Sequence, residues 1–122
     1  MDSRELKERT KQFALRIIRV VDALPKTTSG RAIGNQLVRA GTAVGANYRA
    51  ACLGRSRAEF IAKLGVVIEE ADECGYWLEL IMETGLLPRS RIEPLHQEAN
   101  ELAAIFVASV QTSKSAIPNH KS

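Results

Sequence analysis

Helical spacing of the apolar residues, broken by proline and glycine at the joints, is the sequence feature that most constrains this fold. In residues 3–24 apolar side chains recur every three or four positions, which places them on one face of an α-helix. The run stops at Pro25, whose ring cannot continue a helix. No segment sustains the alternation of apolar and polar residues that is typical of a half-buried strand. The spacing therefore predicts an all-α fold.

The same spacing predicts a second and a third helix. The turn of residues 25–30 leads into the second helix, which is expected to end near Gly54, and the third is expected to run to Gly85. Glycine is common at such ends because it adopts the left-handed conformation that terminates a helix without steric cost.

Two short motifs mark the expected starts of the third and fourth helices. Ser56 and Glu59, and again Ser90 and Glu93, have the serine-to-glutamate spacing of a capping box. In such a box each side chain accepts a hydrogen bond from the backbone N–H of the other residue. From Lys114 onward the composition turns polar, as it does in frayed chain ends.

A chain of 122 residues is large enough for one hydrophobic core but leaves little room for a second domain. Because the predicted connections are short, consecutive helices should pack antiparallel. The sequence thus predicts an antiparallel up-and-down four-helix bundle in residues 1–113, followed by a flexible C-terminal tail in residues 114–122.

Basic residues dominate the second predicted helix and the turn after it. Five arginines and one lysine lie from Lys26 to Arg57, without one Asp or Glu among them. At 100° per residue, four of the arginines fall within a sector of roughly 80°, opposite the apolar residues. A merely solvated face usually mixes both signs of charge, so this one favours contact with the phosphates of RNA or DNA. A solvated face without a partner is the alternative interpretation. The predicted nucleic-acid contacts are Arg31, Arg39, Arg49, Arg55 and Arg57.

Acidic residues dominate the third predicted helix, with seven from Glu59 to Glu83 against one lysine. Most of them project away from the apolar stripe, as a solvent-exposed face does. Glu70 and Glu73 flank Trp77 on this helix. The alternative interpretation for these two is an ion pair with arginines of the second helix, in the same or a neighbouring subunit.

Glycines and outward apolar residues raise the question of a second subunit. Glycine inside a helix costs about 0.5–1 kcal/mol relative to alanine, so the glycines along one flank of the second helix need close packing to offset that cost. The close neighbour could be a helix of the same chain or of another subunit. On the third helix apolar residues also lie outside the inward stripe, which favours two neighbours. We therefore expect a homo-oligomer with an interface that includes Gly41, Gly45, Val66, Glu70, Trp77 and Leu80.

The sequence offers little for catalysis or metal binding. His96 and His120 are the only histidines, and Cys52 and Cys74 have no nearby Cys or His partner. Glu93 and His96 match one copy of the Glu-x-x-His element of di-iron bundles, which need it twice. We therefore expect no enzyme activity, no metal and no cofactor.

The charged N-terminal residues contain no apolar core like that of a signal peptide. No apolar run approaches the roughly 18 residues needed to cross a bilayer. We expect a cytoplasmic protein, in which both cysteines stay reduced. Aromatic residues make up 5% of the chain, which counts against a surface that stacks bases, so phosphates are the expected contact.

Three segments carry a resemblance to a known family. Residues 36–47 read Gln-Leu-Val-Arg-Ala-Gly-Thr-Ala-Val-Gly-Ala-Asn, residues 54–61 read Gly-Arg-Ser-Arg-Ala-Glu-Phe-Ile, and residues 76–80 read Tyr-Trp-Leu-Glu-Leu. Over residues 5–112 the chain resembles the four helix bundle protein family. That family comprises the proteins encoded within intervening sequences of bacterial large-subunit ribosomal RNA genes and the related accessory variability determinant of diversity-generating retroelements.

The resemblance implies an antiparallel four-helix bundle and a ring-like oligomer, expected to be a pentamer. In the retroelement branch it also implies binding of nucleic acid and of a reverse transcriptase through a basic surface. Where many members read Asn-Ile-Ala-Glu-Gly, residues 47–51 read Asn-Tyr-Arg-Ala-Ala, so the family glutamate is missing and Arg49 adds to the basic face. The positions that match the family signature are Arg39, Asn47, Arg55, Ser56 and Phe60.

Taken together, the residues and the resemblance predict a non-enzymatic, oligomeric helical bundle that binds the RNA or DNA backbone through an arginine-rich face of its second helix. The competing hypothesis is a protein–protein interaction adaptor or scaffold that binds no nucleic acid.

Overall fold

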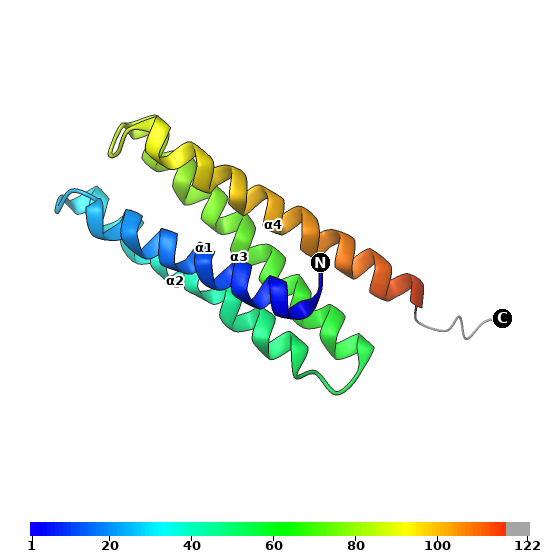
Figure 1. Ribbon diagram of the computed structural model, residues 1–122. Coiled ribbons are helices and arrows are strands. Elements are labelled where there is room, and N and C mark those ends of the chain that lie inside the picture. The colour runs from blue at the N-terminus through cyan, green and yellow to red at the C-terminus, as the bar shows by residue number, and fades with distance from the viewer. Residues whose placement is uncertain (117–122) are drawn as a thin grey trace.

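The computed structural model describes residues 1–116, which form four α-helices joined by short turns. They are α1 (Ser3–Ala23), α2 (Thr28–Cys52), α3 (Arg57–Thr84) and α4 (Arg89–Ala116). Each helix runs opposite to the next in one elongated bundle (Figure 1), so the predicted all-α four-helix architecture is confirmed. Helix α4 continues into the first residues of the predicted tail, and residues 117–122 lie outside the described part of the chain.

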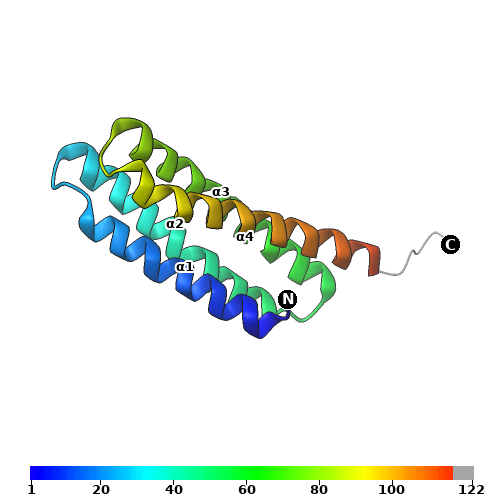
Figure 2. The ribbon, with the colours of Figure 1, turned by 45° about the horizontal axis from the view of Figure 1, so that its top comes forward.

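The helices pack in cyclic order. Helix α2 packs against both α1 and α3, and α3 also packs against α4. A smaller contact between α1 and α4 closes the bundle. Figure 2 shows these two helices diverging toward the end of the bundle where α1 begins and α4 ends. The seam between α1 and α4 is therefore the weakest of the four.

All four helices supply side chains to one core. Fully buried residues include Phe13 of α1, Leu37 of α2, Leu78 of α3 and Phe106 of α4. The rings of Tyr48 and Phe106 pack at a centroid distance of 5.1 Å with a tilt of 44°. Burial of such apolar side chains, at roughly 1.5–3 kcal/mol each, is the main stabilising contribution. The apolar spacing of the sequence therefore corresponds to the observed core.

Helices α2 and α3 both end close to their predicted glycines, but only Gly85 adopts the left-handed conformation expected there. Gly85 terminates α3 with a φ angle of 72°, in the left-handed region that favours glycine. Helix α2 already ends at Cys52, and Gly54 does not adopt a left-handed conformation. Leu53 caps α2 instead, and its N–H donates to the carbonyl oxygens of Ala50 and Ala51, so the helix ends without a residue at positive φ.

Helix starts also differ in part from expectation. The Ser56 hydroxyl accepts a 3.0 Å hydrogen bond from the N–H of Glu59, as predicted. Helix α4, however, begins at Arg89, so Ser90 is its second residue rather than the residue that precedes it. A complete capping box instead joins Asp2 and Glu5 at the start of α1, where the sequence analysis did not place one.

Close packing between α1 and α2 explains the glycines of α2. A Cβ atom on Gly41 would lie 2.6 Å from Cγ2 of Ile17, and one on Gly45 would lie 3.2 Å from Oγ1 of Thr10. These glycines therefore let a helix of the same chain approach, which is the intramolecular alternative stated above. Among residues 1–116, no helix is both long and apolar enough to span a membrane.

Candidate cationic surface

Arg39, at the centre of the predicted basic face, is paired within the chain. Its guanidinium lies 3.2 Å from Oε1 of Glu70 and donates a hydrogen bond to Oε2 of Glu73. Glu73 also accepts a 2.9 Å hydrogen bond from Nε1 of Trp77. The hydrogen bond from Trp77, followed by the one from Arg39, lowers the pKa of Glu73. The hydrogen bond to Glu73 raises the pKa of Arg39. Arg39 is thus not the free cation that the prediction required, whereas the alternative predicted for Glu70 and Glu73 is confirmed.

The remaining predicted contacts do not form a single face of α2. Arg55 lies in the turn between α2 and α3, and Arg57 is the first residue of α3. The prediction placed Arg57 by applying 100° per residue across this turn, where the chain is not helical. The prediction of one continuous arginine face is therefore wrong. At the other end of α2, Arg31 lines a hollow of about 120 Å³ together with Asp22 and Lys26. The carboxylate of Asp22 offsets part of the positive charge there.

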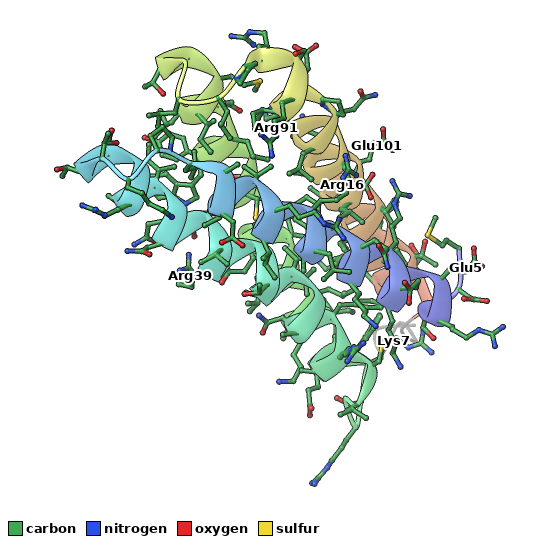
Figure 3. All side chains as sticks on the ribbon, turned by 60° about the vertical axis from the view of Figure 1, so that its left-hand side comes forward. Glu5, Lys7, Arg16, Arg39, Arg91 and Glu101 are labelled. Atoms are coloured by element: carbon green, nitrogen blue, oxygen red, sulfur yellow. The ribbon has the colours of Figure 1, made fainter. Side chains whose placement is uncertain are left out.

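Three cationic side chains line a groove between α1 and α2. Lys7 and Lys11 of α1 line it together with Arg49 of α2, and the groove has a volume of about 310 Å³. In Figure 3, Lys7 lies beside the C-terminal half of α2, well apart from Arg39. None of the residues that line this α1–α2 groove is acidic. Among residues 1–116, these three side chains also take part in no ion pair.

Small residues form the floor of the α1–α2 groove. Gly45 and Ala46 of α2 and Ala14 of α1 leave the space between the cationic side chains open. The hydroxyl of Thr42 donates to the carbonyl of Val38 at 2.7 Å, so its proton is already used. The groove therefore offers an anion flexible ammonium and guanidinium donors above a small, neutral floor.

Lys7 and Lys11 were missed by the sequence analysis because they lie on the first helix. They are spaced i, i+4, which places them on one face of α1, and this spacing was the available signal. Only the packing of α1 against α2 brings them beside Arg49.

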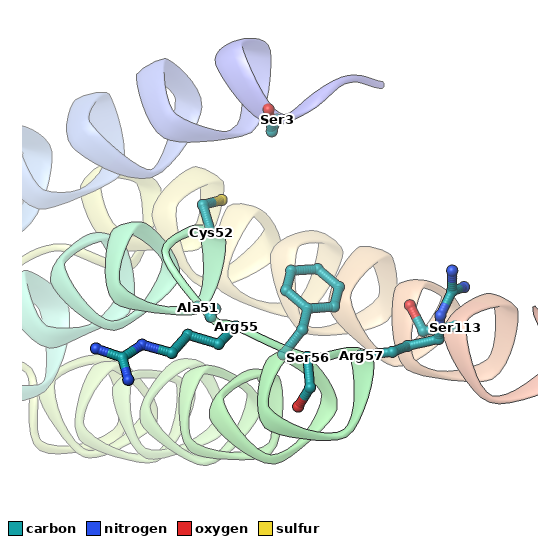
Figure 4. Close-up of a pocket in the computed structure, with 9 residues that line it drawn as sticks. Ser3, Ala51, Cys52, Arg55, Ser56, Arg57 and Ser113 are labelled. Atoms are coloured by element: carbon teal, nitrogen blue, oxygen red, sulfur yellow. The ribbon is translucent and has the colours of Figure 1, made fainter. Parts of the chain in front are cut away.

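Arg55 and Arg57 lie at the end of the bundle instead. They line a cavity of about 520 Å³ with Phe60, Cys52 and Ser113. Figure 4 shows the side chains of Arg55 and Arg57 directed to opposite sides of this cavity. These two arginines are exposed but lie apart from the α1–α2 groove.

The predicted interface residues take different positions. Val66 is 40% exposed on α3, whereas Trp77 and Leu80 are half-buried. Tyr76, which the prediction omitted, is 54% exposed and packs edge-on against Trp77 at a centroid distance of 5.1 Å. Glu70 forms an ion pair with Arg39 of the same chain. The outer surface of α3 therefore keeps an apolar and aromatic strip, while Gly41 and Gly45 serve the packing of α1.

Several positions of the family signature have structural roles in the bundle. The amide of Asn47 donates a 2.8 Å hydrogen bond to the carbonyl of Ala43. Ser56 caps α3, and Phe60 is half-buried against the core. Structural roles in the fold therefore explain these signature residues at least as well as a binding site does.

No group of three or more metal-ligating side chains occurs within residues 1–116. His96 contacts one carboxylate, with Nε2 3.0 Å from Oε2 of Glu79, and Nδ1 lies 3.5 Å from the amide of Asn100. The carboxylate of Glu93 lies 3.9 Å from the guanidinium of Arg89. His120 lies outside the described residues.

Comparison with known proteins agrees with this architecture. Residues 3–108 match the family described as the 23S rRNA-intervening sequence protein. A crystal structure of a protein with unknown function, from the S23 ribosomal protein family of Bacteroides thetaiotaomicron VPI-5482, is similar to this chain with a TM-score of 0.84 and 32% sequence identity. The similarity covers 91% of this chain and 99% of that protein. Among curated proteins none matches. The family match over most of the chain and the shared bundle show that this chain belongs to the 23S rRNA-intervening sequence protein family.

Proposed function

We propose that this protein binds the phosphate backbone of RNA or DNA through the α1–α2 groove, without catalysing a reaction. The observation that supports this proposal is the gathering of Lys7, Lys11 and Arg49 in one groove that no acidic residue lines. Cations without carboxylate partners break no ion pair when they exchange water and counterions for phosphates, so this exchange costs little free energy. The groove replaces the arginine face of α2 as the proposed contact surface.

The proposed binding is weakly selective for sequence. Lysine and arginine at the edge of a shallow groove reach phosphates, which carry no direct information on sequence. In the described part of the chain, no aromatic side chain on which a base could stack lines the α1–α2 groove. Affinity should therefore depend strongly on salt and little on base composition.

Fluorescence anisotropy with a labelled RNA of mixed sequence and a matching DNA duplex tests the proposal. The triple variant Lys7→Gln, Lys11→Gln, Arg49→Gln should bind more weakly, and the slope of log K against log salt should become shallower by about 2–3. Each phosphate contact contributes about 0.9 to this slope for duplex DNA and about 0.7 for single strands.

A matched control removes the same charge elsewhere. Arg19, Lys26 and Arg91 are exposed and take part in no ion pair among residues 1–116, and none lines the α1–α2 groove. Changing these three to glutamine should leave the salt slope nearly unchanged. Equal losses in both triple variants would show that net charge alone drives binding, and no binding by the wild-type chain would refute the proposed function.

A role as a self-associating scaffold is the second candidate, and the outer surface of α3 favours it. Val66 and Tyr76 are exposed on this helix, and Trp77 and Leu80 are half-buried. Exposed apolar and aromatic side chains of this kind are frequent at protein interfaces. Sedimentation equilibrium should give a mass above that of one chain, and Val66→Lys should reduce it. A monomer at micromolar concentration would exclude self-association.

A further inference from the structure

The end of the bundle where α1 begins and α4 ends is not closed. The cavity that contains Arg55 and Arg57 adjoins a second one of about 520 Å³, and the two share Ser3, Phe60 and Ser113 as lining residues. We call the two cavities together the bundle-end hollow. It lies where the weak seam between α1 and α4 opens.

The inner part of the bundle-end hollow is mainly apolar. Leu6 and Tyr48, both buried core residues, form its floor, and the half-buried side chains of Phe60 and Ile105 line its sides. Burial, followed by a hydrogen bond with Cys52, raises the pKa of Tyr48, so the phenol stays neutral at physiological pH. An apolar chain that enters here would exchange water for contact with the core.

The outer part of the hollow is cationic. Arg55 and Arg57 flank Ser56, whose hydroxyl is occupied as the cap of α3. Neither arginine takes part in an ion pair among residues 1–116. Within residues 1–116, neither cavity is lined by an acidic residue. Guanidinium groups bind carboxylates through paired hydrogen bonds, so the rim favours an anionic head group.

We propose that the bundle-end hollow binds a small amphipathic anion, namely a medium-length acyl chain that ends in a carboxylate. The acyl chain lies against Leu6, Phe60 and Ile105, and the carboxylate is held by Arg55 or Arg57. This proposal does not depend on nucleic-acid binding, because it uses neither Lys7, Lys11 nor Arg49.

Size and charge together favour this ligand over a polymer. Each of the two cavities falls in the range of about 300–1,000 Å³ that is usual for small-molecule sites. A nucleic-acid backbone could use the arginines but not the apolar floor. An acyl anion uses both parts of the hollow at once, and each buried methylene strengthens binding by about fourfold.

Isothermal titration calorimetry with decanoate, below its micelle concentration, tests the proposal. Butyrate carries the head without the long chain, and decyltrimethylammonium carries the same chain with a positive head. Decanoate should bind. Decyltrimethylammonium should bind at least about tenfold more weakly, the factor expected for loss of one charged hydrogen bond. Butyrate should also bind more weakly, by about fourfold for each buried methylene that it lacks.

Two variants locate the site. Arg55→Gln with Arg57→Gln should weaken decanoate binding about tenfold, because the charged hydrogen bonds to the head group are lost. Ala108 is exposed and lines the inner cavity, so Ala108→Trp should fill the hollow without disturbing the core and should abolish binding. The control, Arg19→Gln with Arg91→Gln, removes the same charge elsewhere and should change the affinity by less than about twofold.

The outcomes separate the possible occupants. Absence of decanoate binding, equal binding of decyltrimethylammonium, or unchanged binding in both variants would each overturn the proposal. Sedimentation of wild type and Ala108→Trp identifies the remaining case: an oligomer that dissociates on this substitution would show that a second copy fills the hollow. Fluorescence anisotropy measures nucleic-acid binding by the same variants. A failure of the proposed function can therefore be told apart from a failure of decanoate binding.

Discussion

Gly41 of α2 lies directly against Ile17 of α1. The side chain of Ile17 is fully buried and branched at Cβ, so it has few other rotamers to adopt. A methyl group at position 41 would approach its Cγ2, Cγ1 and Cβ atoms to 2.6, 2.8 and 3.0 Å. Real Cβ contacts are longer, so the helices would have to separate.

Gly41→Ala is therefore expected to destabilise the protein by about 1–3 kcal/mol, because overpacking outweighs the gain in helix propensity. Gly65→Ala is the matched control, since among residues 1–116 no atom outside the adjoining backbone of α3 lies within 4 Å of its Cβ position. It should raise the free energy of unfolding by about 0.5–1 kcal/mol. Urea denaturation measures both values, and equal effects of the two substitutions would contradict the close approach of α1 and α2.

The lowered pKa of Glu73 predicts how its contribution to stability varies with pH. Hydrogen bonds from Trp77 and Arg39 favour the ionised carboxylate in the folded state. Its stabilising contribution is thus fully present above the ordinary value of 4.5 and is lost as the pH falls through the lower folded value.

The difference in free energy of unfolding between wild type and Glu73→Gln should accordingly be larger at about pH 6 than at about pH 3. Urea denaturation at several pH values gives this difference. Glu69→Gln, at an exposed position with no ion pair among residues 1–116, serves as the control. A difference for Glu73→Gln that stays constant over this range would mean that the ion pair does not form in solution.

At the scale of helices, one arginine holds α1 against α4. Arg9 donates two 2.7 Å hydrogen bonds to the two carboxylate oxygens of Glu98 and one of 3.0 Å to Glu101. The hydrogen bond to Glu98 is the main reason that the pKa of Arg9 is raised. Because the seam between α1 and α4 has few other contacts, this bidentate pair should matter more than a typical surface ion pair.

Arg9→Met keeps an apolar stem but removes the pair, and it should destabilise α1 by on the order of 1 kcal/mol. Hydrogen exchange should become faster in α1 while α2 and α3 change little. Glu101→Gln is expected to have a smaller effect, since the Glu101 side chain is 52% exposed. Uniform acceleration over all four helices would show that α1 does not open separately.

The helices could be predicted from the sequence, because apolar spacing and the breakers at Pro25 and Gly85 act within each segment. The cationic site could be predicted only in part. Helical angles place Arg39 and Arg49 on the outside of α2, but they do not reveal which neighbouring helix supplies carboxylates and which supplies lysines. That depends on packing between segments: α3 brings Glu70 to Arg39, and α1 brings Lys7 to Arg49.

At the scale of the whole molecule, the two cysteines differ in their access to solvent. Cys74 is fully buried between the helices, and this burial raises the pKa of its thiol to about 12. Cys52 is half-buried and lines the open end of the bundle. The reactive thiolate of Cys74 therefore forms only when the bundle opens.

Labelling with Ellman's reagent should modify Cys52 in the native protein, and Cys74 should react only at the rate of global unfolding. Adding urea below the transition should speed the second reaction alone. The Cys52→Ser variant isolates the Cys74 reaction. Rapid labelling of Cys74 in native buffer would show that α3 is exposed by local opening.

The contact of Gly41 with Ile17 reaches beyond stability. Gly45, one turn further along α2, lies in the floor of the groove that carries Lys7, Lys11 and Arg49. The distance between the two helix axes, and with it the width between the lysines of α1 and Arg49 of α2, is therefore set by positions that have no side chain. A larger side chain at position 41 would push these cations apart, so a residue outside the groove would change how well they match the spacing of phosphates along a nucleic acid.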